Sequence, residues 1–242
     1  MIFFSKSTVG RTRKTNQDVY KNLQTDKYII MAVCDGMGGQ KAGEVAAKIT
    51  CEKCFDFFQK NYSEKKDIIS FIKETIKYAN TQVYNLSRQN EEYSNMGTTI
   101  VFLLYKNKNI YIANVGDSRA YILNRYGLSQ VTKDHSYVSF LLEKGAITKE
   151  ESKKMNNNVI TRAIGIDKFV KADIVVLEDV KNAKILLCSD GLTNEVSDTE
   201  IEKIIKSEDN IRNAVEKLVE TAEEHGGRDN ITVSLFNIGG EV

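Results

Sequence analysis

Residues 34–48 read CDGMGGQKAGEVAAK, and this stretch decides how the surrounding chain folds. The apolar run YIIMAVC (28–34) leads into it and has the length and composition of a buried strand. The run AGEVAAKITCEKCFDFF (42–58) follows and has helical character. An acid, Asp35, therefore stands where the strand should end, with glycines directly behind it. Such a loop could cradle a phosphate, bind a metal ion or form a tight turn.

Composition places the chain among ordinary globular proteins. It has 242 residues, of which 41% are hydrophobic and 28% charged, and its net charge is +1. The balanced charge argues against binding to nucleic acid or to an anionic membrane surface. No run of 18 apolar residues predicts membrane insertion, and MIFFSKSTVGR (1–11) lacks the features of a signal peptide. We expect a cytoplasmic protein.

The cysteines have two possible interpretations. Cys51 and Cys54 form a C-x-x-C pair, while Cys34 and Cys188 lie in apolar runs. A zinc site would need a second pair of ligands at similar spacing. We therefore expect buried thiols in a reducing compartment.

Apolar and β-branched runs predict strands that are distributed over the whole chain. They are expected near residues 2–9, 28–34, 98–105, 109–115, 118–124, 172–177, 184–188 and 231–238. Helical periodicity is clearest at 41–60, 64–90 and 210–224. Three of the strands, 98–105, 109–115 and 118–124, follow one another closely, which predicts an antiparallel meander with a hairpin turn at Gly116-Asp117.

Residues 132–169 differ from the segments on either side. They are polar in the middle and separate two clusters of strands, which indicates an insertion with short helices. Thr148 and Glu151 have the spacing of a capping box, as do Ser197 and Glu200 further on. Because strands occur at both ends of the chain, we expect residues 1–242 to form one domain.

Two phosphate-loop interpretations of the opening stretch fail on its residues. A dinucleotide fingerprint needs a glycine where Lys41 stands, and the G-K-[ST] of a P-loop is absent. An acid at the head of the loop would also repel a phosphate unless a cation intervened.

Acids recur at the ends of other predicted strands. Asp190-Gly191 follows the run KILLCS, Asp229 precedes the run ITVSLF, and Asp117 lies in VGDSR. Carboxylate and carbonyl oxygens suit Mg²⁺ or Mn²⁺ better than zinc, and the Gly36 carbonyl could itself be a ligand. A single Asp-Gly pair would most simply be a turn. Several such acids together favour a metal site.

These motifs, taken in order, resemble those of the metal-dependent protein phosphatase family (PPM, type 2C), most closely its compact bacterial members. The motifs are VGRTRKTNQD (9–18), VCDGMGG (33–39), GTT (97–99), ANVGDSRAY (113–121), TKDHS (132–136), ITRAIG (160–165), CSDGL (188–192) and GGRDNIT (226–232). Each motif alone is weak, but eight in the family's order cover nearly the whole chain. The resemblance implies an α+β fold, a four-layer αββα sandwich of two antiparallel sheets packed face to face with helices on both outer sides.

The resemblance also implies a binuclear Mn²⁺ or Mg²⁺ site. On this basis Asp35 bridges two ions and Gly36 gives its carbonyl to the first. Asp190 and Asp229 complete the ligands of the second ion. A third, weaker ion is implied at Asp117, shared with Asp190.

Other positions carry implied roles or departures. Asp18 matches an acid that acts near the metals through water, and Arg13 matches the arginine that binds the substrate phosphate. Arg13 and Asp35 are thus the expected catalytic residues. Met37 stands where many eukaryotic relatives have histidine, and methionine cannot donate a proton. Gln17 stands where many relatives have glutamate.

The expected activity is that of a protein-serine/threonine phosphatase, a phosphoric monoester hydrolase that uses a metal-bridging water. The resemblance implies phosphoproteins as substrates and a bacterial Hanks-type kinase as the opposing enzyme in signalling, and we expect a monomer. Residues 132–169 match the family's flap. His135 is expected to have a structural hydrogen-bonding role, and His225 to lie at a helix C-terminus. The alternatives are a non-catalytic phosphoprotein-binding pseudophosphatase and a phosphatase dedicated to one regulatory phosphoprotein.

Overall fold

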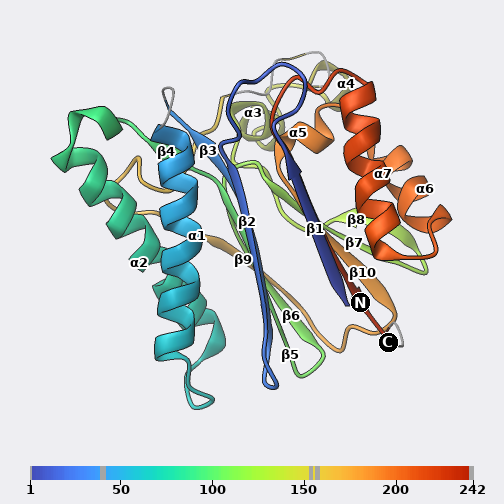
Figure 1. Cartoon of the computed structure of the whole chain (residues 1–242), viewed down its shortest axis with the longest axis horizontal. Coiled ribbons are helices and arrows are strands. Elements are labelled where there is room, and N and C mark those ends of the chain that lie inside the picture. Colours follow the sequence, from blue (N-terminus) through green and yellow to red (C-terminus); the bar gives the residue numbers. More distant parts are fainter. Residues whose placement is uncertain (1, 39–41, 153–154, 156–158, 240–242) are drawn as a thin grey trace.

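The computed structural model describes residues 2–38, 42–152, 155 and 159–239, which form four layers (Figure 1). One sheet has the order β2 (Asp18–Gln24), β3 (Ile29–Met37), β5 (Ile100–Lys106), β6 (Asn109–Val115) and β9 (Asp173–Leu177), with β4 (Gly97–Thr98) beside β3. The other has the order β1 (Phe3–Thr8), β11 (Ile231–Ile238), β10 (Ala183–Cys188), β7 (Arg119–Asn124) and β8 (Gly127–Gln130). All the pairings are antiparallel. The four-layer αββα prediction is confirmed.

Helices cover the outer face of each sheet (Figure 1). Helices α1 (Ala42–Asn61) and α2 (Ile68–Gln89) pack on the first sheet, and α6 (Asp198–Ser207) and α7 (Ile211–Glu224) pack on the second. Side-chain caps begin three of them, at Asp67, Ser197 and Asn210. The apolar stripe predicted for 210–224 is buried against the second sheet.

Strand β3 shows why the first sheet is buried on both faces. Ile30, Ala32 and Cys34 face α1 and α2, whereas Met31 and Val33 face the other sheet. All five side chains are fully buried, so the strand needs apolar residues at every position rather than at alternate ones. The four cysteines are likewise buried and free, as predicted.

The predicted three-strand meander is wrong at its third strand. β5 and β6 pair with each other, but β6 then pairs with β9, while β7 belongs to the second sheet between β10 and β8. Gly116 and Asp117 therefore form a crossover between the two sheets and not a hairpin turn. The physical reason is that the edge of β6 is already taken by β9, a strand that comes more than fifty residues later in the chain.

Three strands were absent from the prediction. β2 has the sequence DVYKNLQ, which is too polar to indicate a strand, and it lies at the edge of its sheet. β4 and β8 have only two and four residues. Strand β3 also continues two residues beyond Asp35, because Gly36 and Met37 pair with Thr98 and Gly97 of β4.

The predicted insertion contains two short helices, α3 (Tyr137–Glu143) and α4 (Lys149–Ser152). The capping box is confirmed, because the Thr148 N–H donates to the Glu151 carboxylate and the Glu151 N–H donates to Thr148 Oγ1. Residues 153–154 and 156–158 of the insertion lie outside the described residues. A 3₁₀ helix, η1 (Glu91–Tyr93), follows α2. No helix among the described residues has the length and apolar character needed to cross a bilayer.

The layer between the first sheet and its helices contains an aromatic cluster that can be tested. The Phe58 ring lies 5.0 Å from that of Phe71 and 5.2 Å from that of Tyr28, and the side chain is fully buried. We predict that Phe58→Ala lowers the free energy of unfolding by about 3–5 kcal/mol, because it leaves a cavity in this layer. Urea denaturation followed by circular dichroism measures the change.

Phe169→Ala is the matched control, because Phe169 is 74% exposed. It should change the free energy of unfolding by no more than about 0.5 kcal/mol. Equal effects of the two substitutions would contradict this description of the core.

Candidate active site

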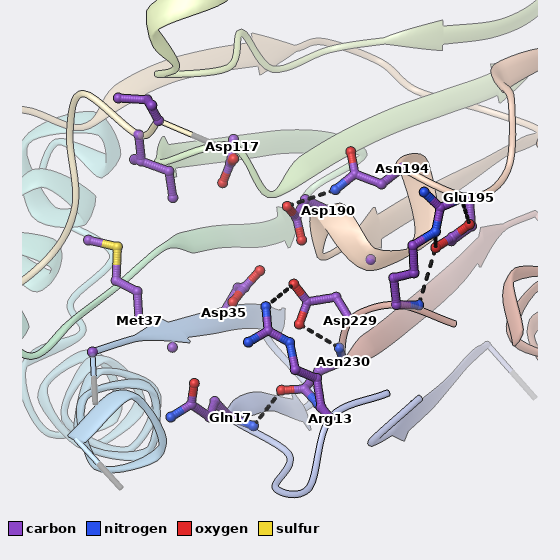
Figure 2. A pocket seen from close by; sticks show the side chains of 16 residues that line it. Arg13, Gln17, Asp35, Met37, Asp117, Asp190, Asn194, Glu195, Asp229 and Asn230 are labelled. Carbon is purple, nitrogen blue, oxygen red and sulfur yellow. Dashed lines mark hydrogen bonds and ion pairs between the residues drawn. The ribbon is translucent and has the colours of Figure 1, made fainter. Parts of the chain in front are cut away.

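A cavity of about 870 Å³ opens at the edge of the sandwich where strand ends from both sheets meet. Six of the seven predicted site residues line it: Arg13, Asp35, Gly36, Asp117, Asp190 and Asp229. They come from separate parts of the chain, and Figure 2 shows Asp35, Asp190 and Asp229 at the centre, Asp117 above them and Arg13 below. Gln17 and Met37 also line the cavity. Residues that are far apart in the sequence, such as Arg13 and Asp229, thus share one site.

Asp35 is held by hydrogen bonds to its backbone, which leave its carboxylate to the cavity. Its N–H donates to Thr99 Oγ1 at 3.0 Å, and its carbonyl accepts from Thr98 Oγ1 at 2.8 Å. Thr99 Oγ1 in turn lies 2.6 Å from Ser118 Oγ, which connects β3 to the crossover between the sheets. Two threonines directly before β5 therefore fix the position of this acid.

Gly36 is required by close packing. A Cβ at this position would lie 2.2 Å from the carbonyl oxygen of Gly43 in α1 and 2.7 Å from that of Gln17. Only glycine allows the start of α1 and the loop before β2 to approach the strand so closely.

Asp190 and Asp229 are brought together by a second close approach. Asp190 begins the short helix α5 (Asp190–Thr193) directly after β10, and its Oδ2 accepts from Asn194 Nδ2 at 3.0 Å. A Cβ on Gly191 would lie 2.0 Å from the carbonyl oxygen of Asn230, so the two loops can be adjacent only with glycine at position 191.

Arg13 pairs with Asp229 across the cavity wall. Its Nη2 lies 2.9 Å from Asp229 Oδ2, while Asp229 Oδ1 accepts from the Asn230 N–H at 2.8 Å. The arginine side chain remains 55% exposed. The residue expected to bind phosphate and one expected to bind metal thus contact each other directly.

Asn230 organises the loop that carries Arg13. Its amide Nδ2 donates to the carbonyls of Val9 and Thr15, both at 3.0 Å, and its Oδ1 accepts from the Gln17 N–H at 2.8 Å. These three bonds fix the segment before β2 next to the start of β11. Asn230 belongs to the GGRDNIT motif, which does not by itself indicate this role.

Asp117 stands at the crossover between the sheets and is 4% exposed. The preceding Gly116 has φ +105°, and a Cβ there would lie 2.5 Å from Thr99 Cγ2. Glycine is therefore needed at the point where the chain changes sheets.

Asp18 is the one predicted site residue that does not line the cavity. It lies opposite Asp35 in the β2–β3 register, is 6% exposed, and its Oδ2 accepts from Ser189 Oγ at 2.7 Å. Asp18 thus lies beside Asp35 in the sheet, and its action near the metals through water stays a prediction.

Burial and mutual repulsion shift the acids in the same direction. Burial raises the pKa of Asp35 well above its usual range, and the neighbouring carboxylates of Asp18 and Asp190 raise it further. Burial also raises the pKa of Asp18 and of Asp117, each to about 7. For Asp190, burial and then the charge of Asp229 raise the pKa. The site therefore concentrates negative charge that calls for positive countercharge.

The residues present fit hard divalent cations. Oδ1 of Asp18, Asp117 and Asp190 is buried and has no hydrogen-bond partner among the described residues. Oxygen ligands of this kind suit Mg²⁺ or Mn²⁺. Among all the residues that the structure describes, no three His, Cys, Asp or Glu side chains are arranged around a single point that could hold an ion. Cations here would therefore take part of their coordination from backbone carbonyls and water, as Mg²⁺ commonly does.

Some supporting residues could have been found from sequence. Asn194 follows Asp190 by four residues, which places the two side chains one helical turn apart. The contact between Thr99 and Ser118 has no such local spacing in the sequence, because only the fold brings the start of β5 next to the start of β7.

Comparison with known proteins gives a consistent result. The family model described as protein phosphatase 2C matches residues 6–231. The serine/threonine phosphatase stp of Listeria monocytogenes is 37% identical over 234 residues, which cover 93% of this chain and 91% of that protein. The crystal structure of serine/threonine phosphatase Stp1 from Staphylococcus aureus superposes with a TM-score of 0.92 at 36% identity, covering 99% and 96% of the two chains.

A further solved structure is relevant to the metal question. The catalytic domain of the serine/threonine protein phosphatase PstP, in complex with two manganese ions, superposes with a TM-score of 0.86 at 28% identity and covers 98% of each chain.

The crowding of acids makes a prediction about stability. In the presence of a chelator at neutral pH, Asp35→Asn should raise the free energy of unfolding by about 1–3 kcal/mol, because it removes a carboxylate that is costly to bury beside other carboxylates. Denaturation by urea in excess EDTA measures this, without any assay of activity.

Asp56→Asn on the exposed side of α1 is the control and should change little. Addition of Mn²⁺ should stabilise the unsubstituted protein more than the Asp35→Asn variant. A less stable Asp35→Asn variant in EDTA would contradict the account of the acidic cavity.

Proposed function

The chain belongs to the protein phosphatase 2C family, and from this premise we propose how its own residues perform the family's reaction. It is a metal-dependent protein-serine/threonine phosphatase, which confirms the activity expected from its motifs. The observation that carries the assignment of residues is the convergence of Arg13 and four aspartates on one cavity. The substrates we propose are phosphoserine and phosphothreonine in proteins.

Two divalent cations, Mn²⁺ or Mg²⁺, would be held at the centre of this cavity. Asp35 would bridge them, the Gly36 carbonyl would serve the first, and Asp190 and Asp229 would serve the second. Support comes from the hard oxygen ligands, from the buried Oδ1 of Asp190, which has no hydrogen-bond partner in the described part of the chain, and from the manganese in the PstP structure. Asp117, with Asp190, would hold a third ion, and Asp18 would act through water.

When bound, such cations supply a water of lowered pKa for in-line attack on phosphorus and positive charge that offsets that of the phosphate. Arg13 binds the phosphate oxygens through its planar guanidinium. Its bond to Asp229 holds the guanidinium over the cavity, next to the acids that would carry the cations. Asp35, whose backbone is bonded to Thr98 and Thr99, would hold the cations in place and in this way would help to orient the attacking water. Met37 also lines the cavity but cannot protonate the leaving oxygen.

The alternatives are disfavoured by specific residues. A pseudophosphatase that only binds phosphoproteins would be expected to lack some of the ligands, whereas all those expected are present. A phosphatase dedicated to one regulatory phosphoprotein is disfavoured by Arg13 together with the full-length flap. We propose that the opposing enzyme is a bacterial Hanks-type kinase, with both acting in cytoplasmic signalling, and that the phosphatase works as a monomer of one domain.

The first test is metal dependence. Hydrolysis of p-nitrophenyl phosphate and of phosphothreonine peptides should require added Mn²⁺ or Mg²⁺ and stop in EDTA. Asp35→Ala and Asp190→Ala should each lower kcat by at least about 100-fold, because each removes a group on which transition-state charge stabilisation depends. Unchanged rates in both variants would refute the assignment, and phosphopeptide binding without turnover at saturating Mn²⁺ would favour the pseudophosphatase.

The second test separates Arg13 from general loop charge. Arg13→Ala should lower kcat/KM for phosphopeptides by about 10- to 100-fold, since it removes a charge-assisted contact worth about 1.5–3 kcal/mol. Arg11→Ala is the matched control, because Arg11 is exposed, lies on the same loop and does not line the cavity. Equal losses in the two variants would show that only the net charge of the loop matters.

A further inference from the structure

His135 lies outside the cavity lining, yet it contacts the crossover that carries Asp117. The side chain is 6% exposed. Its Nδ1 accepts from the N–H of Gly116 at 3.0 Å, and its own backbone N–H donates to the carbonyl of Gly116 at 2.9 Å. Both backbone polar groups of Gly116 are therefore satisfied by one residue.

The same histidine joins the two ends of the flap, residues 132–169. It belongs to the segment that enters the flap, and its carbonyl accepts from the Thr161 N–H at 2.8 Å on the segment that leaves it. Ser136 and Ile160 form a β-bridge next to this bond, and the Tyr137 N–H donates to the Val159 carbonyl at 2.8 Å. Val159 and Ile160 line the cavity. The neck of the flap is thus closed at His135, beside the site.

The far side of the imidazole faces a charged pair at the base of the flap. Nε2 lies 3.3 Å from Asp173 Oδ2 and 2.9 Å from Arg162 Nη1, and Arg162 Nη1 also lies 2.9 Å from Asp173 Oδ1. Because Nδ1 accepts a bond from Gly116, the proton of the neutral ring is on Nε2 and can be donated to Asp173. Arg162 Nη1, itself a donor, then directs its two hydrogens to the Lys171 carbonyl and to Asp173 Oδ1 and not to the ring. Burial lowers the pKa of His135, and the charge of Arg162 lowers it further, which agrees with a neutral ring.

We propose that His135 is a positioning residue that sets Gly116 and Asp117 at the edge of the cavity and couples them to the neck of the flap. Each ring nitrogen makes one of the two connections: Nδ1 fixes the crossover, and Nε2 fixes the base of the flap through Asp173. The neck of the flap and the backbone that carries Asp117 are thereby held by the same residue. The consequence for cation binding rests on the function proposed above for Asp117, whereas the coupling itself does not.

The contacts of the two ring nitrogens can be removed separately by substitution. In His135→Asn, Oδ1 stands near the place of Nδ1 and can accept from Gly116, but the shorter side chain does not reach Asp173. In His135→Gln, the amide reaches the place of Nε2 and can donate to Asp173, but the acceptor for Gly116 is lost. Both variants keep a polar side chain in the buried position, so they guard against the unfolding that His135→Ala could cause.

Amide hydrogen exchange in the cation-free protein is the first measurement, since it needs no activity. The Gly116 amide should exchange about tenfold faster in His135→Gln than in the unsubstituted protein, the factor that corresponds to a hydrogen bond of about 1.4 kcal/mol. In His135→Asn it should stay protected, while amides of the flap neck, Tyr137 and Thr161, exchange faster. His225→Asn and His225→Gln are the matched controls and should leave the Gly116 amide unchanged. An unchanged Gly116 amide in His135→Gln would overturn the proposal.

The Mn²⁺ concentration for half-maximal activity is the second measurement. His135→Gln should raise it about three- to tenfold, in the direction of Asp117→Asn, while His135→Asn raises it less. If Asp117→Asn has no effect on Mn²⁺ dependence but the Gly116 amide is exposed in His135→Gln, the proposed role of Asp117 fails and the positioning role of His135 stands. If Asp117→Asn shifts the Mn²⁺ dependence and His135→Gln matches the unsubstituted protein in both measurements, the positioning role fails alone.

Discussion

Repulsion among buried carboxylates is the constraint on which the rest of this structure depends. Asp18 and Asp117 are buried and Asp35 and Asp190 are half-buried, and burial together with neighbouring negative charge raises the pKa of each. A cluster of this kind opposes folding, so the surrounding scaffold must hold it in place. The three apolar clusters packed between the four layers of the sandwich supply that stability, while these acids lie at the edge where strands end. The fold thus separates the part that stabilises from the part that reacts.

Close backbone contacts convert this general arrangement into defined positions. At Gly36 and Gly191 the space for a side chain is filled by a carbonyl oxygen of another segment, so the acid next to each glycine is placed by main-chain packing. The hydroxyls of Thr98 and Thr99 bond to the backbone of Asp35, and the Asn230 side chain bonds to the backbone of the loop that carries Arg13, so these side chains do not occupy the carboxylates that face the cavity. Such support keeps the carboxylate oxygens available for cations while limiting their movement.

The sequence allowed much of this to be predicted, and the errors have physical causes. Strand β3 was found because burial on both faces demands a continuous apolar run, and β11 because its apolar and β-branched residues are typical of a strand. The polar strand β2 was missed, because at the edge of a sheet its order comes from pairing with β3 and not from composition. Strand β6 pairs with β9 and not with the predicted β7, because this pairing depends on contacts between residues far apart in the chain, which local sequence patterns do not show. For the site, the acids and Arg13 stood out through their motifs. A structural hydrogen-bonding role was expected for His135, but its partners, like the task of Asn230, became visible only with the fold, since each residue joins segments far apart in the chain.

The pairing of β1 with β11 has a consequence for how the molecule is made. The first and last strands lie side by side, and Asp229 and Asn230 stand immediately before the last of them (Figure 1). During synthesis, Arg13 and Asp35 leave the ribosome long before Asp229 and Asn230, which complete their surroundings. Contacts of such large sequence separation form late, so the cavity closes only when the last strand has joined its sheet. A chain that ended before β11 would carry most of the acids without the loop geometry that makes them a site.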